Sequence, residues 1–554
     1  MTASENQSDG NNQSKVEDTD ARGEKIDEET GSDSSDKKSN LRSKLAGEFR
    51  IDTKLLSYKA FYFLFFGGFG SSFPYMSLYF RQIGLNASLV GLLAGIRPLI
   101  QFASAPFWSV ISDKFKARKA VLLFSIVAWI VMTLALLLPQ PRNTVCREVK
   151  LPIAAGGRGR SDIPEPELET EYFQDEPKLV KSNNGQFEIV SKTGNRWRVT
   201  RTVNTSKDAG FLGGNDTKSR HFELIRDPHE IHKVFMWLMI LVVGGEFLEA
   251  PTFILADTAL LQKLQEKRKH YGKTRLFGSL GYATASFIVG AVLETTRFQY
   301  CGETHNDYKY LFYIFAGVML LALLFAAVLF EFTYEDDGND GKVDECAVWK
   351  ILLQPKYAFF MTIAWFLGFS NGLIFNFLNW YLEDLGASKL LMGSATTMRA
   401  AGLLIAFFVN SYLTDRLGHI CVSFLSILSY FSLFVWLAVM RNPWLAFPLE
   451  FLEGLTYGTS WSTCVTYMAD ATPMSGAATM QGILQGVYWG LGGGLGAILG
   501  GVVIDEYGAV PSFYAGGVLS FALLIAMSVI HVCMEKKRKD VKREWTPIPF
   551  EEEK

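Results

Sequence analysis

Apolar stretches of membrane-crossing length recur along this chain of 554 residues, separated by shorter polar segments. An α-helix of about 20 apolar residues spans the hydrocarbon core of a bilayer, which is ~30 Å thick. The pattern therefore predicts an all-α membrane protein with twelve transmembrane helices in two sets of six. The predicted spans are 56–80, 88–111, 119–138, 233–257, 275–295 and 309–331, then 356–380, 388–413, 419–440, 444–469, 481–504 and 511–533.

The second set of spans repeats part of the first. When the sequence is shifted by 302 residues, Tyr79–Asp113 aligns without a gap on Tyr381–Asp415, and seven of 35 positions are identical. An internal duplication explains why the shared residues include glycine, arginine and aspartate as well as apolar residues. We therefore expect two pseudo-symmetric six-helix bundles, at 55–331 and 356–533. The identical pairs are Tyr79/Tyr381, Gly84/Gly386, Leu89/Leu391, Gly91/Gly393, Arg97/Arg399, Ser109/Ser411 and Asp113/Asp415.

Three polar segments flank or join the two bundles. Residues 1–54 are rich in Asp, Glu, Ser and Lys and have few large apolar side chains, so burial cannot compensate for the entropy lost on ordering them. We expect a disordered cytosolic tail there. An acidic cytosolic linker is expected at 332–355 and a second cytosolic tail at 534–554.

Lysine and arginine in the short connections set the expected orientation. They cluster at 114–119, 263–275 and 536–539, whereas the connections on the other side of the predicted membrane carry scattered cations. Cytoplasmic loops are enriched in Lys and Arg. We therefore expect both termini in the cytosol, and the plasma membrane rather than an internal membrane.

A long polar insertion, 139–231, separates the third and fourth spans and is expected outside the cell or in a lumen. It contains two acceptor sequences for N-glycosylation, at Asn204 and Asn215, which predict a glycoprotein. Its segment 185–204 alternates apolar and polar residues around a Thr-Gly-Asn turn, which predicts a β-hairpin.

Composition excludes several classes of protein. The chain is 49% hydrophobic with a mean hydropathy of +0.14, and its net charge of −2 gives no basis for a nucleic-acid partner. The expected partner is the lipid bilayer. The six cysteines show neither a C-x-x-C pair nor metal-ligand spacing, so we expect no metal and no cofactor. Cys146 and Cys301 both fall on the outer side, where a disulfide persists, but two unrelated cysteines fit the sequence equally well.

Four glutamates lie inside predicted spans at matching positions. Glu246 and Glu249 fall on the fourth span, and Glu450 and Glu453 fall on the tenth with the same spacing of three. An ionisable side chain that faces lipid at this depth costs about 2.5–3.5 kcal/mol, so these side chains are expected to face a polar cavity or a charged partner. They are candidates for substrate binding or proton coupling. The alternative is a set of ion pairs with a structural role alone.

Arg97 and Arg399, the duplicated arginines, lie at a depth similar to that of the glutamates. Arg97 is about 13 Å from the outer end of its helix at a rise of 1.5 Å per residue. A neighbouring arginine favours the charged form of a carboxyl group, whereas burial favours the neutral form, so a glutamate under both influences can take up and release a proton. We expect the two arginines to meet the glutamates inside the bundle.

Four further side chains on the predicted spans are candidates for the wall of a cavity. Tyr75 and Tyr488 offer rings for stacking on a ligand. Asn371 and Asn376 offer amides, which cost less to bury than charges and also form hydrogen bonds between helices. Packing between helices is the alternative for all four.

Two similar charged motifs follow the second and eighth spans, Ser109-Val-Ile-Ser-Asp-Lys-Phe-Lys-Ala-Arg and Ser411-Tyr-Leu-Thr-Asp-Arg. Both resemble the cytoplasmic signature of the major facilitator superfamily, Gly-x-x-x-Asp-Arg-x-Gly-Arg-Arg, with serine in place of the first glycine. The resemblance implies an inner latch that pairs charges between the halves when the cytoplasmic side is shut. Positive-inside anchoring and solvated helix ends are the alternatives. The latch residues would be Asp113, Lys114, Arg118, Asp415 and Arg416, with Asp257 and Asp470 as partners of the arginines Arg118 and Arg416.

A closer resemblance covers nearly all of residues 55–533. The segments YFLFFGGFGSSFPYMSLYFRQIGL, GIRPLIQFASAPFWSVISDKF and KTRLFGSLGYA, with a long insertion between the third and fourth spans, are similar to the major facilitator superfamily domain-containing protein 6 family of animals. The resemblance implies a twelve-helix transporter fold. In the superfamily the first, fourth, seventh and tenth helices line a central cavity, which would place both glutamate pairs on cavity helices.

These observations favour a secondary transporter that moves a small polar solute by alternating access, coupled to protons. The alternative is a membrane receptor or scaffold that binds a protein ligand through the insertion 139–231. No nucleotide-binding loop, metal spacing or motif-linked nucleophile and base indicates an enzyme.

Overall fold

The computed structural model places most of the predicted spans and part of the insertion. The tail 1–54, the sequons Asn204 and Asn215, and most of the linker 332–355 lie outside the described residues. The described residues are 56–142, 144–149, 178–181, 187–190, 196–198, 221–264, 271–301, 303–330, 332, 350–472 and 477–544.

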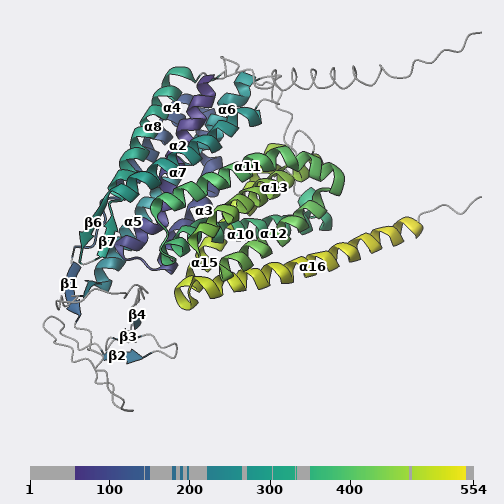
Figure 1. The fold of residues 1–554 in the computed structure, drawn as a ribbon. Coiled ribbons are helices and arrows are strands. Elements are labelled where there is room, and N and C mark those ends of the chain that lie inside the picture. Colours follow the sequence, from purple (N-terminus) through teal and green to yellow (C-terminus); the bar gives the residue numbers. More distant parts are fainter. Residues whose placement is uncertain are drawn as a thin grey trace, which may run out of the picture. The chain divides into compact units, whose positions relative to one another are not determined.

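The first half of the chain forms six helical spans, and the fourth of them is broken in two (Figure 1). The break falls at Pro251, which lacks the backbone N–H that donates a hydrogen bond in a continuous helix. The helices are α2 (Leu56–Ile83), α3 (Ala87–Lys114), α4 (Arg118–Ala135), α5 (Pro228–Glu249), α6 (Pro251–Leu264), α7 (Tyr271–Thr295) and α8 (Lys309–Leu329).

The second half forms six more spans, and its fifth contains a π-helical segment, η5 (Gly486–Gly493). Such wide turns are rare and bend a helix locally. The last helix is longer than the predicted span, because it continues into the charged segment after residue 533. The elements are α10 (Pro355–Asp384), α11 (Lys389–Leu417), α12 (His419–Val439), η3 (Pro443–Leu445), α13 (Ala446–Ala471), α14 (Ala477–Gln485), α15 (Gly494–Tyr507) and α16 (Ala509–Glu544).

These twelve spans confirm the predicted helical architecture. Ten are long and apolar enough to cross a membrane by length and composition. The other two, α2 and α13, are also long but contain several Gly, Ser or Tyr residues, and α13 carries two glutamates.

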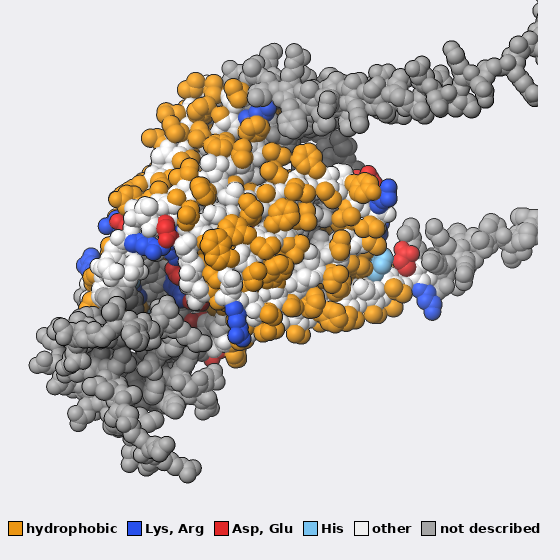
Figure 2. All heavy atoms as spheres, in the orientation of Figure 1, with side chains coloured by type: hydrophobic (Ala, Val, Ile, Leu, Met, Phe, Trp, Pro, Cys, Tyr) orange, Lys and Arg blue, Asp and Glu red, His pale blue; other side chains and the backbone are white. Residues whose placement is uncertain are grey.

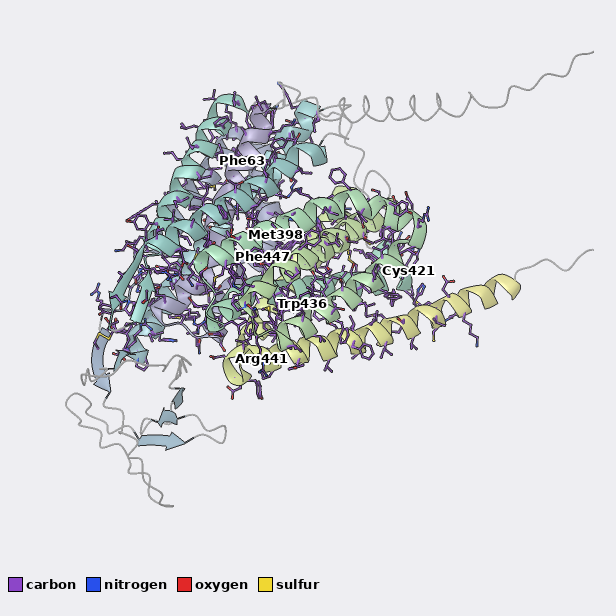
Figure 3. All side chains as sticks on the ribbon, viewed as in Figure 1. Phe63, Met398, Cys421, Trp436, Arg441 and Phe447 are labelled. Carbon is purple, nitrogen blue, oxygen red and sulfur yellow. A yellow bond between two sulfur atoms is a disulfide. The ribbon has the colours of Figure 1, made fainter. Side chains whose placement is uncertain are left out.

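Many apolar side chains point outward, as expected of a surface in contact with lipid. Hydrophobic side chains cover most of the described face in Figure 2. Among the 18 most apolar consecutive residues of each helix, 72% are buried in α10 and 17% in α16. Helix α10 is therefore central and α16 peripheral. Side chains fill the spaces between the ribbons (Figure 3).

The two halves repeat each other in structural detail. Gly84 and Gly386, which are 302 residues apart, both have positive φ, of 114° and 78°, and end their helices in the same way. The hydroxyl of Tyr79 donates to the Leu136 carbonyl oxygen, and that of Tyr381 donates to the Met440 carbonyl oxygen. The duplication visible in the sequence therefore recurs in these local contacts.

The most extensive contacts between the halves are those of α3 with η5 and α15 and that of α7 with α11. We call the ends of the helices near Gly84 and Gly386 the insertion end, because the insertion leaves α4 and enters α5 there. We call the opposite ends, near Asp113 and Asp415, the Asp113 end.

Short antiparallel strands occur in and near the insertion. Strands β1 (Thr144–Val149) and β5 (His221–Arg226) pair with each other, as do β6 (Arg297–Tyr300) and β7 (Glu303–Asn306). The segment predicted as a hairpin contains β3 (Phe187–Val190) and β4 (Arg196–Arg198), which pair antiparallel. Strand β2 (Lys178–Lys181) joins them as a third strand on β3.

A disulfide ties the insertion to the first bundle. Cys146 in β1 and Cys301 after β6 are bonded, with their Cα atoms 5.5 Å apart. The bond joins the start of the insertion to the connection between α7 and α8. The predicted protein-binding role of 139–231 stays a prediction, because most of that segment lies outside the described residues.

Candidate functional site

The structure brings Arg97 of α3 and Glu246 of α5 together inside the first bundle. The Nε atom of Arg97 donates to Oε1 of Glu246 at 2.6 Å, and the two side chains are 13% and 4% exposed. Glu249 lies one turn further along α5 and is also buried. Its Oε2 has no hydrogen-bond partner among the described residues. The two glutamates therefore differ. Glu246 neutralises the charge of Arg97, whereas Oε2 of Glu249 accepts no hydrogen bond from a described residue.

The second bundle contains an equivalent group. The Nε atom of Arg399 on α11 donates to Oε2 of Glu450 on α13 at 2.5 Å. Oε2 of Glu453 lies 2.8 Å from the same nitrogen, but it forms no hydrogen bond within the described part of the chain. We call the two groups the first triad (Arg97, Glu246, Glu249) and the second triad (Arg399, Glu450, Glu453).

An aromatic ring covers the arginine of each triad. The guanidinium carbon of Arg97 lies 4.8 Å from the centre of the Phe73 ring, and that of Arg399 lies 5.3 Å from the centre of the Phe375 ring. Cation–π contacts of this kind stabilise a desolvated arginine. The sequence interpretation missed both rings, although Phe375 follows Phe73 at the 302-residue spacing of the repeat.

Close packing of two helices positions the second triad. A Cβ atom at Gly454 on α13 would lie 2.0 Å from the carbonyl oxygen of Arg399, which is far too close for any side chain. Because residue 454 is glycine, the backbones of α11 and α13 approach closely enough for Arg399 to reach both glutamates.

Each triad holds one permanent positive charge and two carboxyl groups. If both carboxyls were ionised, the buried group would carry a net charge of −1, which is costly in a region without water. Glu249 and Glu453 can each hold a proton without breaking the hydrogen bond that Arg97 or Arg399 donates to the other glutamate. A void of about 10 Å³, near the lower limit for one water molecule, borders Arg97, Glu246 and Glu249.

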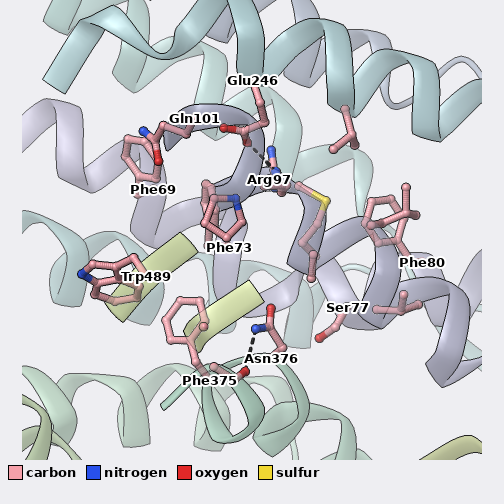
Figure 4. A pocket seen from close by; sticks show the side chains of 18 of the residues that line it. Phe69, Phe73, Ser77, Phe80, Arg97, Gln101, Glu246, Phe375, Asn376 and Trp489 are labelled. Atoms are coloured by element: carbon pink, nitrogen blue, oxygen red, sulfur yellow. Dashed lines mark hydrogen bonds and ion pairs between the residues drawn. The ribbon is translucent and has the colours of Figure 1, made fainter. Parts of the chain in front are cut away.

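A larger cavity of about 190 Å³ opens beside the first triad (Figure 4). Its wall contains side chains from both halves of the chain, including Phe73 and Trp489. Its aromatic residues are Phe69, Phe73, Phe80, Trp129, Phe253, Phe375 and Trp489, and its polar residues are Ser77, Arg97, Gln101, Glu246 and Asn376.

Of the four predicted cavity residues, Asn376 lies on this wall and the other three do not. Tyr75 donates its hydroxyl hydrogen to the Ser286 carbonyl oxygen, and the Tyr488 hydroxyl lies 3.2 Å from Ser460 Oγ. Asn371 is 2% exposed. Tyr75, Asn371 and Tyr488 pack between helices in this structure, which is the alternative that the sequence left open. Trp489, the neighbour of Tyr488, lines it instead.

The second triad does not border this cavity. Arg399, Glu450 and Glu453 are absent from its lining and lie in the packed interface of α11 and α13. The two triads therefore have the same composition but different access to the cavity.

At the Asp113 end, two predicted latch residues of the first half, Asp113 and Asp257, form ion pairs within that half. Asp113 accepts a hydrogen bond from Arg118 at 2.7 Å, five residues further along. Asp257 pairs with Arg275 at 3.0 Å and accepts from the Tyr62 hydroxyl at 2.5 Å. The expected partnership of Asp257 with Arg118 is therefore replaced by one with Arg275.

The equivalent residues of the second half form no arginine–carboxylate pair within the described part of the chain. Asp470 is 76% exposed at its side chain and lies 3.9 Å from His419 rather than against Arg416. The guanidinium of Arg416 lies over the ring of Tyr412 instead. Lys114 and Asp415 have no ion pair among the described residues. In this conformation the described ion pairs at the Asp113 end do not join the halves.

Charged residues at the insertion end do join the halves, and the sequence interpretation did not anticipate them. Arg81 on α2 contacts Glu383 at 3.2 Å and Asp384 at 2.5 Å, both at the end of α10. Lys389 pairs with Glu383 through its Nζ at 2.5 Å, and its backbone N–H donates to Glu294 on α7 at 2.9 Å. We call these five residues the insertion-end network.

Among the described residues, no group of three or more His, Cys, Asp or Glu side chains is arranged to hold a metal ion. Nothing in the geometry of the triads calls for one, because each carboxyl pair already has an arginine.

Comparison with known proteins agrees with this architecture. The model of the MFS_1 like family matches residues 55–515. A Danio rerio protein named major facilitator superfamily domain-containing protein 6-like is 22% identical over 499 residues, covering 86% of this chain and 88% of its own. These matches confirm the resemblance expected from the sequence.

Two solved structures share the fold. That of the nucleoside transporter NupG has a TM-score of 0.60 at 14% identity and covers 86% of this chain and 99% of its own. That of the D-xylose-proton symporter has a TM-score of 0.53 at 12% identity and covers 86% of this chain and 96% of its own. At these identities the likeness shows the arrangement of helices and leaves the solute open.

Proposed function

Because the chain belongs to the MFS_1 like family, a family of transporters and not of enzymes, we propose that it carries a small organic solute across the membrane by alternating access, coupled to protons. The chain is an integral multi-pass membrane protein, which is the setting this activity requires. The observation that carries the proposal is the first triad, where an arginine–glutamate ion pair forms part of a cavity wall and a second glutamate lies next to it.

Binding and proton transfer are linked through Arg97. A solute that engages the guanidinium changes the electrostatic field at Glu246 and Glu249 without touching either carboxyl. A proton on Glu249 offsets the charge of the triad while the cavity is occupied, and it leaves when the solute leaves. Coupling in this scheme results from charge balance at a buried site.

The distribution of ion pairs supports alternating access. The insertion-end network joins the two halves, whereas the described ion pairs at the Asp113 end stay within one half. This arrangement fits a state that is closed at the insertion end. The opposite state requires the network to separate.

The proposal is tested with the purified full chain in liposomes that contain a pH-sensitive dye. Addition of a transported solute outside should acidify the lumen, and Glu249→Gln should abolish the acidification because the amide cannot carry a proton. Glu535→Gln, an exposed carboxyl near the end of α16, is the control and should behave like the unaltered protein. Equal acidification by the Glu249→Gln variant would refute Glu249 as the proton carrier.

A further inference from the structure

The wall of the cavity beside the first triad is more apolar than a binding site for a polyhydroxylated solute would be. Seven aromatic residues line it, against five residues with polar or charged side chains. Two of the five, Arg97 and Glu246, are bonded to each other, and Nδ2 of Asn376 donates to the Gly372 carbonyl oxygen at 2.7 Å. A sugar would leave several hydroxyl groups without partners, each at a cost of about 1–3 kcal/mol.

Arg97, which lines the cavity, retains unused donors. Its Nε is bonded to Glu246, but Nη1 and Nη2 donate no hydrogen bond within the part of the chain that the structure describes. A guanidinium edge with two parallel N–H groups fits the two oxygens of a carboxylate. The arginine can therefore bind an anion while it keeps its bond to Glu246.

The accessible charge in the cavity wall is positive. The Arg97 side chain is 13% exposed and that of Glu246 is 4% exposed, so the guanidinium rather than the carboxylate is presented to a ligand. Glu246 is already neutralised at 2.6 Å, and a cationic ligand next to it would also lie close to Arg97. The aromatic rings alone would accept an organic cation, but the positive charge of Arg97 repels one.

The volume limits the size of the ligand. An apolar protein cavity of about 150 Å³ takes up benzene. The space of about 190 Å³ therefore accommodates one aromatic ring with a short side chain. The rings of Trp129, Phe253 and Trp489 line the same space and offer stacking surfaces.

We infer that the cavity binds a small monocarboxylate with an aromatic or similarly apolar body, held by paired hydrogen bonds from Arg97 to the carboxylate. This inference rests on the proposed transport function and specifies its substrate class. Binding adds one negative charge next to the triad, and uptake of one proton by Glu249 keeps the total charge of triad and ligand at −1, the charge of the empty triad with both carboxyls ionised. The chemistry thus corresponds to symport of an organic anion with a proton.

Three probes of nearly equal shape separate the ligand classes: phenylacetate, phenylacetamide and phenethylamine. Each is added to the purified full chain, and the thermal unfolding midpoint is measured, since a ligand that binds the folded state alone raises it. Phenylacetate should raise the midpoint, and the amide and the amine should not. Stabilisation by the amine, equal stabilisation by the amide, or no response to phenylacetate would overturn the inference.

A substitution locates the site. Arg97→Lys keeps the positive charge but loses the paired donors, and it should weaken phenylacetate binding at least tenfold, a loss of about 1.4 kcal/mol. The matched control is Arg441→Lys, at an exposed arginine beyond the end of α12. Unchanged phenylacetate affinity in folded Arg97→Lys protein would exclude Arg97 as the anion site. If that variant does not fold, the comparison of the three probes on the unaltered chain still decides the ligand class.

The outcomes for binding and transport can be told apart. If phenylacetate stabilises the chain but acidifies the lumen no faster than in protein-free liposomes, which its neutral acid form enters unaided, the substrate class stands as a ligand class and the transport proposal fails. If a sugar or nucleoside drives acidification and phenylacetate does not bind, transport stands and the substrate class is wrong.

Discussion

At the scale of single residues, the two glutamates of the first triad have different tasks although they are three positions apart. Glu246 is bonded to Arg97, whereas Oε2 of Glu249 has no partner among the described residues. Removing one member of a buried ion pair leaves the other charge uncompensated, at a cost of about 3–5 kcal/mol. Replacing an unpaired carboxyl by an amide of the same shape removes no ion pair.

We therefore predict effects of very different size on stability. Glu246→Gln should lower the thermal midpoint markedly, by the loss of roughly 3–5 kcal/mol of unfolding free energy. Glu249→Gln should change the unfolding free energy by less than about 1 kcal/mol. Both are measured by thermal unfolding in detergent without ligand. Equal destabilisation by the two variants would contradict this division of tasks.

At the scale of elements, the close contact of α11 and α13 depends on one position. Gly454→Ala would place a methyl group 2.0 Å from the Arg399 carbonyl oxygen, so the helices must separate. Overpacking of this kind costs about 1–3 kcal/mol, and here it would also pull Arg399 away from its glutamates.

The expected result is a lower thermal midpoint and less folded protein for Gly454→Ala. The control is Gly482→Ala in α14, where a Cβ atom would meet nothing within 4 Å. Alanine favours helix over glycine by about 1 kcal/mol, so this control should match or exceed the stability of the unaltered chain. A Gly454→Ala protein as stable as the control would show that the helices can separate without penalty.

Elements were predictable from sequence where a local pattern determines them. The twelve spans follow from apolar run length, and their observed ends fall within a few residues of the predicted ones apart from α16 and the fourth span, which runs from Pro228 to Leu264. The meeting of Arg97 with Glu246 was also foreseen, because a buried charge at that depth needs an opposite charge. The residue spacing of the repeat extended the same reasoning to Arg399.

Partnerships that depend on the register between distant helices were not predictable. Asp257 was expected against Arg118 but pairs with Arg275, which lies 18 residues further along the chain. Tyr75 and Tyr488 were expected in a cavity, but both pack between helices. Trp489, the next residue after Tyr488, points in another direction around the helix and lines the cavity. The insertion-end network was missed because Arg81 lies among ordinary helix-end residues, and its partners are about 300 positions away.

At the scale of the whole molecule, the insertion-end network should hold one side of the cavity shut. Its central side chains are 30–40% exposed, so the ion pairs of Arg81 contribute about 1 kcal/mol in total. Arg81→Ala should shift the balance between closed and open forms roughly fivefold toward opening at that end.

This prediction is tested with a cysteine at Ser77 on the cavity wall, in a chain whose Cys421 and Cys533 are changed to serine. A membrane-impermeant thiol reagent added on the insertion side should label Ser77→Cys several-fold faster when Arg81→Ala is present. Lys233→Ala is the control, since Lys233 pairs with Glu230 in the same helix and this ion pair does not join the two halves. Labelling that is no faster with Arg81→Ala would show that the network does not close the cavity.

The separation of each arginine from its glutamate along the chain has a consequence for biosynthesis. Arg97 and Glu246 are 149 residues apart, because the insertion lies between them, whereas Arg399 and Glu450 are 51 apart. At a synthesis rate of about 5–20 residues per second, Arg97 waits roughly 7–30 s for its partner and Arg399 roughly 3–10 s. The first bundle therefore carries an unneutralised arginine through the membrane-insertion machinery for about three times as long as the second.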